Sequence, residues 1–254
     1  INKKVIKYEA QQNYFKITTE DKNEYFAEKI YDSRPRKFKD NDYLQHFFGI
    51  NISAPDNTFN EKQATLMHFT GEKNLLHFIY VLPFTHNNAL VESTVFSTYV
   101  LDEDWYRQKI KNYLQENLIN NYHELSYERG IIPMFFNNVN KIHTPNIFDI
   151  GIRGGACKPS TGYAFSFLIK QIQLLKKNNT KYDKVHKFID KKMDKIFLNY
   201  LKNNNENGNS FINLAKQING QEFQSFMMGE STMWTKFKVI KSMPKLPFLK
   251  TFIK

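Results

Sequence analysis

Hydrophobic and polar residues alternate with a period of two over much of the first hundred residues, which is typical of β-strands. Residues 1–31 contain three such clusters, and the polar segment 19–23 between the last two predicts a turn. We therefore predict a small antiparallel meander that ends at Tyr31. Further strands are predicted over residues 43–54, 63–70, 75–84 and 88–98.

The apolar spacing becomes helical over residues 102–120, and Asp102 is the predicted N-cap. Two short strands near residues 123–128 and 131–136 follow, and then a buried strand over residues 147–152. These alternating strands and helices predict an α/β fold with a mixed sheet.

The C-terminal part of the pattern is helical. A glycine-rich turn at residues 151–155 leads into a helix predicted from about Thr161 to Lys177. From Tyr182 onward the pattern remains helical, with a polar break at residues 203–209. We predict a helical part over residues 181–254.

Composition narrows the class of protein. Of the 254 residues, 41% are hydrophobic and 24% are charged, which is typical of a globular chain. The net charge of +11 favours nucleic acid or anionic lipid as a partner. The chain shows no nucleic-acid motif, so nucleic acid is not an expected partner. Cys157 is the one cysteine and no zinc spacing is present, which predicts no metal site and fits a reducing cytosol.

Aromatic residues make up 15% of the chain, including 23 Phe. Such a composition has two interpretations. It produces a core rich in Phe, or it lines an apolar cavity for a long hydrophobic ligand.

Glu92 lies in an otherwise apolar strand, in the segment ALVEST. A carboxyl group among apolar side chains has a raised pKa, because burial disfavours its charged form. A raised pKa keeps a proton available near neutral pH and suits a general acid. The alternative is a glutamate on the solvent side of an amphipathic strand.

The segment GIRGGACKPSTGY spans residues 151–163. Its glycines allow the backbone to approach a ligand closely. A helix beginning near Ser160 or Thr161 directs its positive end at this turn, where it stabilises an anionic group. The alternative is a tight strand-to-helix turn with a Ser/Thr cap.

Five segments together resemble one family. They are DSRP (residues 32–35), QHFFG (45–49), FIYVLPFTHNNALVEST (78–94), ERGIIPM (128–134) and GIRGGACKPSTGYAF (151–165). The chain resembles the lycopene β-cyclases of the bacterial flavoprotein type from about residue 14 to residue 250. The PSTGY and LPF…ALVE segments are specific, whereas DSRP alone is weak.

The resemblance implies a hydroxylase-like FAD/NAD(P)-binding flavoprotein fold. It implies an FAD-dependent lycopene cyclase that closes β-ionone rings on the ψ-ends of lycopene, without net redox change. An acid protonates the terminal double bond, a carbocation forms, the ring closes and a proton is lost. The resemblance further implies that reduced FAD stabilises the cation or takes part in proton transfer, that NADPH is the reductant, and that the enzyme is a cytoplasmic protein on the membrane surface.

The resemblance also implies roles for individual residues. Glu92 matches the glutamate that protonates the substrate, and Glu128 matches a glutamate near the flavin and the substrate end; an ordinary turn charge is the alternative for Glu128. Asp32 and Arg34 either contact the flavin region or form a structural salt bridge. The remaining expected flavin contacts are Gly151, Gly154, Gly155, Pro159, Ser160, Thr161 and Gly162.

Four ranges are expected to act as domains. A remnant of the FAD-binding domain covers residues 1–36, and a substrate-binding mixed sheet with one helix covers 37–145. A flavin-contacting turn and helix covers 146–180, followed by the helical part over 181–254.

The chain departs from the family pattern in places. The dinucleotide fingerprint GxGxxG is absent, so we expect an N-terminally truncated chain that is inactive by itself. His68 stands where the family has Asp, and Arg153 where a small residue is usual. The alternatives are an isoprenoid reductase or hydroxylase of the same superfamily, or a non-catalytic basic module that binds a membrane.

The last nineteen residues suggest a membrane contact. Residues 236–254 contain no acidic residue, and apolar residues lie between their six lysines, Lys236, Lys238, Lys241, Lys245, Lys250 and Lys254. These lysines are predicted to seat the protein on anionic lipid. The alternative is that the apolar residues pack on the domain and the lysines face water, since Pro244 and Pro247 interrupt a long helix.

Overall fold

The computed structural model describes residues 3–34, 37–134, 145–177, 184–204 and 208–245. The chain forms two compact units. Unit 1 comprises Ile1–Lys37, Asn137–Cys157 and Ala164–His186, and unit 2 comprises Phe38–Phe136, Lys158–Tyr163 and Lys187–Lys254. Each unit therefore combines segments that are distant in the sequence.

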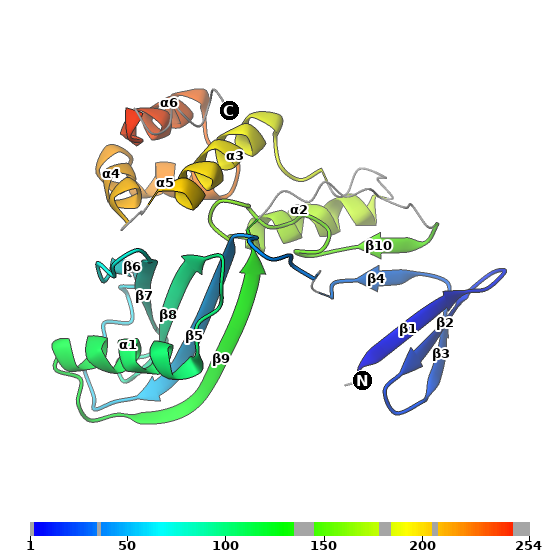
Figure 1. The fold of residues 1–254 in the computed structure, drawn as a ribbon, viewed down its shortest axis with the longest axis horizontal. Coiled ribbons are helices and arrows are strands. Elements are labelled where there is room, and N and C mark those ends of the chain that lie inside the picture. The colour runs from blue at the N-terminus through cyan, green and yellow to red at the C-terminus, as the bar shows by residue number, and fades with distance from the viewer. Residues whose placement is uncertain (1–2, 35–36, 135–144, 178–183, 205–207, 246–254) are drawn as a thin grey trace. The chain divides into compact units, whose positions relative to one another are not determined.

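Unit 1 contains the predicted meander and one parallel strand pair (Figure 1). Strands β1 (Val5–Ala10), β2 (Phe15–Thr19) and β3 (Glu24–Ala27) pair antiparallel in chain order. The meander ends at Ala27 and not at Tyr31, because β4 (Ile30–Asp32) pairs in parallel with β10 (Ile147–Asp149).

Strand β10 differs from its prediction. It has three residues and is half-buried, whereas a buried strand over residues 147–152 was expected. The strand ends early because Gly151 turns the backbone with φ +66°, a left-handed conformation that glycine adopts without strain. The helix of unit 1, α2, spans Phe165–Lys176.

Unit 2 is built on a five-stranded sheet in the order β6-β7-β8-β5-β9. Its pairings are antiparallel, so the parallel pairing expected of a mixed sheet is found between β4 and β10 instead. The strands are β5 (Leu44–Ser53), β6 (Thr65–Phe69), β7 (Leu76–Pro83), β8 (Asn88–Ser97) and β9 (His123–Pro133).

Four of these strands confirm the predicted ranges within a few residues. Strand β9 is the exception, because two short strands were expected and one long edge strand is found (Figure 1). It pairs with β5 from Ser53↔His123 to Leu44↔Pro133, and a bulge at Asn51/Ile52 absorbs the irregularity in between.

Helix α1 (Glu103–Glu116) covers one face of the sheet, which we call the first face. The alternate residues Phe48, Ile50 and Ile52 of β5 pack there with Ile110 and Leu114 of α1. This burial follows from the period-two pattern of β5 and the helical spacing of α1.

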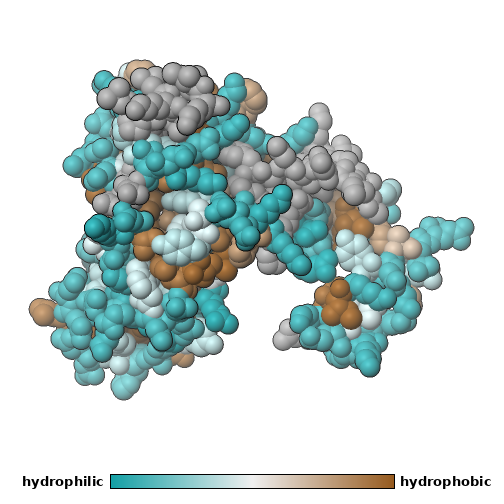
Figure 2. All heavy atoms as spheres, viewed as in Figure 1, coloured by the Kyte–Doolittle hydropathy of each residue, from teal (hydrophilic) through white to brown (hydrophobic). Residues whose placement is uncertain are grey.

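Helix α3 (Phe188–Asn203) packs on the opposite, second face near one end of the strands. Leu198 and Leu201 contact a cluster that includes Phe78 and Phe96. Figure 2 shows hydrophobic residues gathering on unit 2 between the sheet and the C-terminal helices. The remaining helices are α4 (Asn209–Gln217), α5 (Gly220–Met227) and α6 (Met233–Ser242).

Candidate active site on the five-stranded sheet

One row of residues crosses the second face of the sheet and brings the two predicted catalytic glutamates together. Glu92 on β8 and Glu128 on β9 are both paired with Gly49 on the central strand β5. Tyr80 on β7 is paired with Glu92 and extends the row. Directly paired residues of antiparallel strands point to the same face, so these side chains converge.

Gly49 gives the two glutamates the space that they share. A Cβ atom at Gly49 would lie 3.3 Å from Cβ of Glu92 and 3.4 Å from Cγ of Glu128. It would also lie 3.0 Å from Cδ1 of Leu90, which is tighter than an ordinary contact. The lack of a side chain on the central strand therefore lets two carboxyl groups from flanking strands approach each other.

Glu92 has the environment of a proton donor. Its residue is 9% exposed, and burial raises its pKa from 4.5 to about 7. The Thr94 hydroxyl donates a hydrogen bond of 2.6 Å to Oε1 and opposes the rise in pKa. The charge and hydrogen bonding of Glu128 reinforce the rise, so a proton is retained near neutral pH.

Tyr80 adds a neutral phenol group to the row. Burial raises the pKa of Tyr80, and the charge of Glu92 adds to this effect. The phenol therefore remains protonated. Among the residues of the row, Glu92 is therefore the one whose raised pKa lets it exchange a proton near neutral pH.

The KPSTGY segment, residues 158–163, forms a compact turn on this face, near the end of the strands that α3 covers. The backbone N–H groups of Thr161 and Gly162 donate to the Lys158 carbonyl, and that of Lys158 donates to the Tyr163 carbonyl. Gly162 has φ +74°, and a Cβ atom there would lie 1.9 Å from Oε1 of Gln45 on β5. The turn therefore lies directly against the central strand.

A buried ion pair ties the turn to helix α3. The Lys158 ammonium pairs with Oδ1 of Asp194 at 2.5 Å, and the Ser160 hydroxyl donates to the same oxygen at 2.6 Å. Lys158 and Asp194 are almost completely buried. Ser160 is thus a partner of Asp194, a contact that the sequence did not indicate.

The predicted start of helix α2 near Ser160 or Thr161 is wrong, and so is the alternative of a Ser/Thr cap there. The helix begins at Phe165 with Ala164 at the N-cap position, so Ser160 and Thr161 do not cap it. The reason is the left-handed Gly162, which closes the turn before the helix can start. The helix end therefore gives no support for anion binding at Ser160 or Thr161.

Among the described residues, the buried polar atoms at the turn that lack a hydrogen-bond partner include Oγ1 of Thr161, Oε1 of Gln45 and Oδ2 of Asp194. The Asp194 oxygen belongs to the ion pair already described, which leaves the atoms of Thr161 and Gln45. Buried polar atoms are normally satisfied, so an unpaired pair beside one turn suits a polar ligand edge. Gln45 and Gly49 are four residues apart on β5, which corresponds to about 13 Å along a strand.

The glycines at the end of β10 lie in unit 1 and form a turn that is closed by internal hydrogen bonds. The amide of Gly151 donates to Oε1 of Gln171 at 2.8 Å, and Nε2 of Gln171 donates to the Gly154 carbonyl at 3.1 Å. The amides of Gly154 and Gly155 donate to backbone carbonyls. These amides are engaged within the turn, so the predicted close approach of a ligand would have to use other groups.

Asp32 and Arg34 form a salt bridge, one of the two alternatives left open by the sequence. Arg34 donates to Oδ1 of Asp32 at 2.9 Å and to Oδ2 at 2.7 Å, while Nε of Arg153 lies 3.4 Å from Oδ2. The Arg34 side-chain hydrogen bonds lower the pKa of Asp32. Arg153 also pairs with Asp149, so this unusual arginine belongs to the same network. A role of Asp32 and Arg34 in flavin binding remains a prediction.

The other candidate positions add no reactive group to the site. His68 packs edge-on against Tyr113 with ring centroids 5.1 Å apart, and Pro159 is buried in its turn. The residues that the structure describes contain no group of three metal-ligating side chains. The same residues include no helix long and apolar enough to cross a bilayer.

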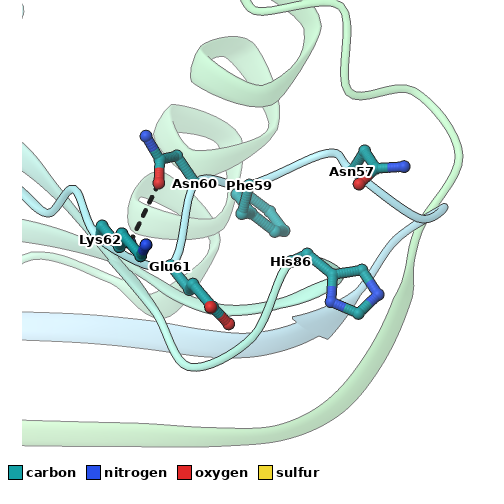
Figure 3. A pocket seen from close by; sticks show the side chains of 6 residues that line it. All are labelled: Asn57, Phe59, Asn60, Glu61, Lys62 and His86. Carbon is teal, nitrogen blue, oxygen red and sulfur yellow. Dashed lines mark hydrogen bonds between the residues drawn. The ribbon is translucent and has the colours of Figure 1, made fainter.

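A hollow of about 510 Å³ lies among loops of unit 2, lined by residues of the β5–β6 and β7–β8 connections (Figure 3). The Asn60 side chain accepts a hydrogen bond from the Lys62 amide there. No predicted site residue lines this hollow, which is open to solvent. The carboxyl pair and the KPSTGY turn are better candidates for chemistry.

Several site residues escaped prediction although the sequence contains a signal for some of them. A glycine inside a strand marks a close approach, and Gly49 lies in the middle of QHFFGINIS. Asp190 and Asp194 lie on the face of α3 that its leucines bury, where charged residues need partners. No local signal identifies Gln45 or Lys158, because their neighbours come from distant segments.

Comparison with known proteins bears on the family and the fold of the chain. A family model described as lycopene cyclase protein matches residues 1–252. A search of proteins with curated functions finds no match.

Among solved structures, the chain is similar to a geranylgeranyl bacteriochlorophyll reductase-like protein from Thermoplasma acidophilum, with 12% identity and a TM-score of 0.58, covering 98% of this chain and 68% of that one. HpxO of Klebsiella pneumoniae, solved with FAD and uric acid, matches with 9% identity and a TM-score of 0.46, covering 95% and 67% of the two chains. The first similarity confirms the predicted α/β fold class.

Proposed function

Because the chain belongs to the lycopene cyclase family, we propose that it catalyses acid-initiated, non-redox cyclisation of the ψ-ends of lycopene. The observation that carries the proposal is Glu92, a buried carboxyl group with a pKa raised to about 7 beside a second carboxyl group, that of the exposed Glu128. Such a group holds a proton at neutral pH and can deliver it to a carbon–carbon double bond.

Glu92 protonates the terminal double bond, and the resulting carbocation closes the ring. Loss of a proton then yields the β-ionone ring. Glu128 is positioned to accept that proton or to hold Glu92 in its protonated state, since the two carboxyl groups share the space over Gly49. Once Glu92 has given up its proton, its negative charge also stabilises the nearby carbocation.

The cofactor we propose is reduced FAD, with NADPH as the reductant. The KPSTGY turn offers a fitting edge, because Thr161 Oγ1 and Gln45 Oε1 are buried polar atoms without partners. When bound, the reduced flavin would supply an electron-rich ring that stabilises the carbocation. Thr161 and Gln45 are the residues that would hold its polar edge.

One alternative has a specific observation in its favour. The fold is similar to a protein described as geranylgeranyl bacteriochlorophyll reductase-like, and an isoprenoid reductase would act on a related substrate. Reduction adds hydrogen to the product, whereas cyclisation leaves its mass unchanged. Mass spectrometry of the pigment therefore separates the two functions.

The experiment is expression of the complete reading frame in cells that accumulate lycopene, followed by chromatography of the pigments. Glu92→Gln should lower cyclisation by about 10²–10⁴-fold, the usual contribution of a general acid. Glu116→Gln, at the exposed end of α1, is the matched control and should leave the rate unchanged. Cyclisation by Glu92→Gln at the parent rate would refute the proposed role.

A further inference from the structure

Helix α6 presents an apolar stripe on its outward side. Met233, Trp234, Phe237 and Ile240 each have between 55% and 65% of their surface exposed. The Trp234 and Phe237 rings are stacked with centroids 5.7 Å apart. In Figure 1 the helix is the outermost of unit 2, with α4 and α5 on the side of the strands.

The opposite side of α6 is packed in the protein. Thr235, Lys236 and Val239 are buried, and Val239 contacts a cluster that includes Leu214 of α4. The stripe is therefore not the side by which the helix is held in the fold. Its exposure is a property of a helix that is already fixed in position.

The lysines of this region fall into two groups. Lys236 is buried and paired with Asp190, and Lys238 is paired with Glu222 at 2.6 Å. The prediction that Lys236 contacts lipid is therefore wrong, because its ammonium group is needed to neutralise a buried carboxylate. Lys241 and Lys245 are exposed beyond the C-terminal end of the stripe. Lys250 and Lys254 lie outside the described residues.

We propose that the stripe on α6 docks on the surface of an anionic lipid bilayer. A helix lying in the interface buries one apolar face among the acyl chains, and aromatic side chains such as Trp234 are favoured at that depth. Lys241 and Lys245 then lie where anionic headgroups attract them, and the net charge of +11 draws the whole chain to such a surface. The inference rests on the proposed function for its purpose, since lycopene is dissolved in lipid.

The test is co-sedimentation of the protein from the complete gene with vesicles of phosphatidylcholine alone or mixed with phosphatidylglycerol. The double variant Trp234→Ser/Phe237→Ser should lower the partition coefficient on mixed vesicles by at least about tenfold, because it removes two large apolar side chains from the contact. Lys241→Gln/Lys245→Gln should lower binding to mixed vesicles and leave binding to phosphatidylcholine unchanged.

The matched control is Leu118→Asn, which removes a leucine that is 84% exposed at the end of α1. Its φ of +61° is one that Asn accepts, so the fold should be kept. This variant should bind vesicles as the parent does. Circular dichroism of each variant establishes that a loss of binding is not a loss of folding.

Two results would overturn the inference. One is parent-like vesicle binding by the Trp234→Ser/Phe237→Ser variant. The other is a parent protein that forms dimers which the same variant dissolves, since the stripe would then be a protein interface. Vesicle binding needs no catalysis, so a protein that binds lipid through α6 but makes no cyclic carotenoid would refute the proposed function alone.

Discussion

The two faces of the five-stranded sheet bury polar groups in opposite ways. On the first face, His46 contacts the hydroxyls of Tyr106 and Ser97, and His77 contacts those of Thr70 and Ser93. Burial lowers the pKa of His46 to about 4 and that of His77 to about 3. Both rings are therefore neutral and fully partnered beneath α1.

The second face buries groups that are charged or that hold a proton which they can release. Where α3 covers it, Asp194 is neutralised by Lys158. Farther along the strands, Glu92 has a second carboxyl group as its neighbour. Neutral hydrogen bonds satisfy a structural face at little cost, whereas an acidic group beside another acidic group costs stability. The comparison thus separates the face that holds the fold from the face that is suited to chemistry.

The largest effect is expected where the second face is structural. Asp194→Ala leaves the Lys158 ammonium buried without its carboxylate, and should lower the free energy of unfolding by about 3–5 kcal/mol. Urea unfolding at pH 7 measures this difference. Replacing both residues, as Lys158→Met/Asp194→Leu, should restore most of the stability. A single variant that is as stable as the parent would show that the pair is not holding the turn.

A second prediction concerns the opposite pH dependence of the two faces. The pKa of Glu92 is raised in the folded protein, so its contribution favours folding below pH 4.5 and is lost as the pH rises through about 7. Glu92→Gln should therefore raise the free energy of unfolding by about 1–3 kcal/mol at pH 8 and change it little at pH 4.

The histidines titrate in the other direction. Because the pKa of His77 is lowered in the folded state, stability is full above pH 6.5 and falls as the pH drops towards 3. His77→Leu should flatten this acid limb, at the cost of about 1–3 kcal/mol at pH 7 from the two hydroxyls left without a partner. Chemical unfolding at several pH values tests both variants. If both changed stability in the same direction at every pH, the contrast between the faces would be lost.

The smallest expected effects are shifts in the dependence of the cyclisation rate on pH. Cyclisation should fall as the pH rises through about 7, because Glu92 acts in its protonated form. Thr94→Val removes a hydrogen bond that lowers the pKa of Glu92, so the fall should move to higher pH. Glu128→Gln removes a neighbouring negative charge and should move it to lower pH. Equal profiles for the two variants would exclude Glu92 as the titrating group.

Local patterns predicted what local sequence determines. The period-two runs located β5, β7 and β8, and the apolar surroundings of Glu92 indicated its burial. The same patterns could not reveal which strands meet. Nothing near Glu92 in the sequence indicates that Glu128 lies one strand beyond Gly49, because that placement depends on the strand order β8-β5-β9.

Turn chemistry explains the errors in the predicted helix and strand ends. The residues PST suggested the start of a helix. They instead form a separate turn with the left-handed Gly162, and α2 begins only at Phe165. Likewise Tyr31 continued an alternating pattern, but its partner in β4–β10 is Phe148, far away in the chain. A local turn therefore displaced the predicted start of the helix, and long-range pairing displaced the predicted end of the meander.

The parallel pair β4–β10 has a consequence for the order of folding. Joining Asp32 to Asp149 closes a loop of about a hundred residues, which in an unfolded chain costs roughly 4 kcal/mol of entropy. The sheet of unit 2 shortens that loop when it folds first, because the pairing of β5 with β9 brings the start and the end of the intervening segment together. At this point the Met134 amide donates to the Tyr43 carbonyl at 2.8 Å. Once the sheet has formed, pairing β4 with β10 closes a much shorter loop and therefore costs less entropy.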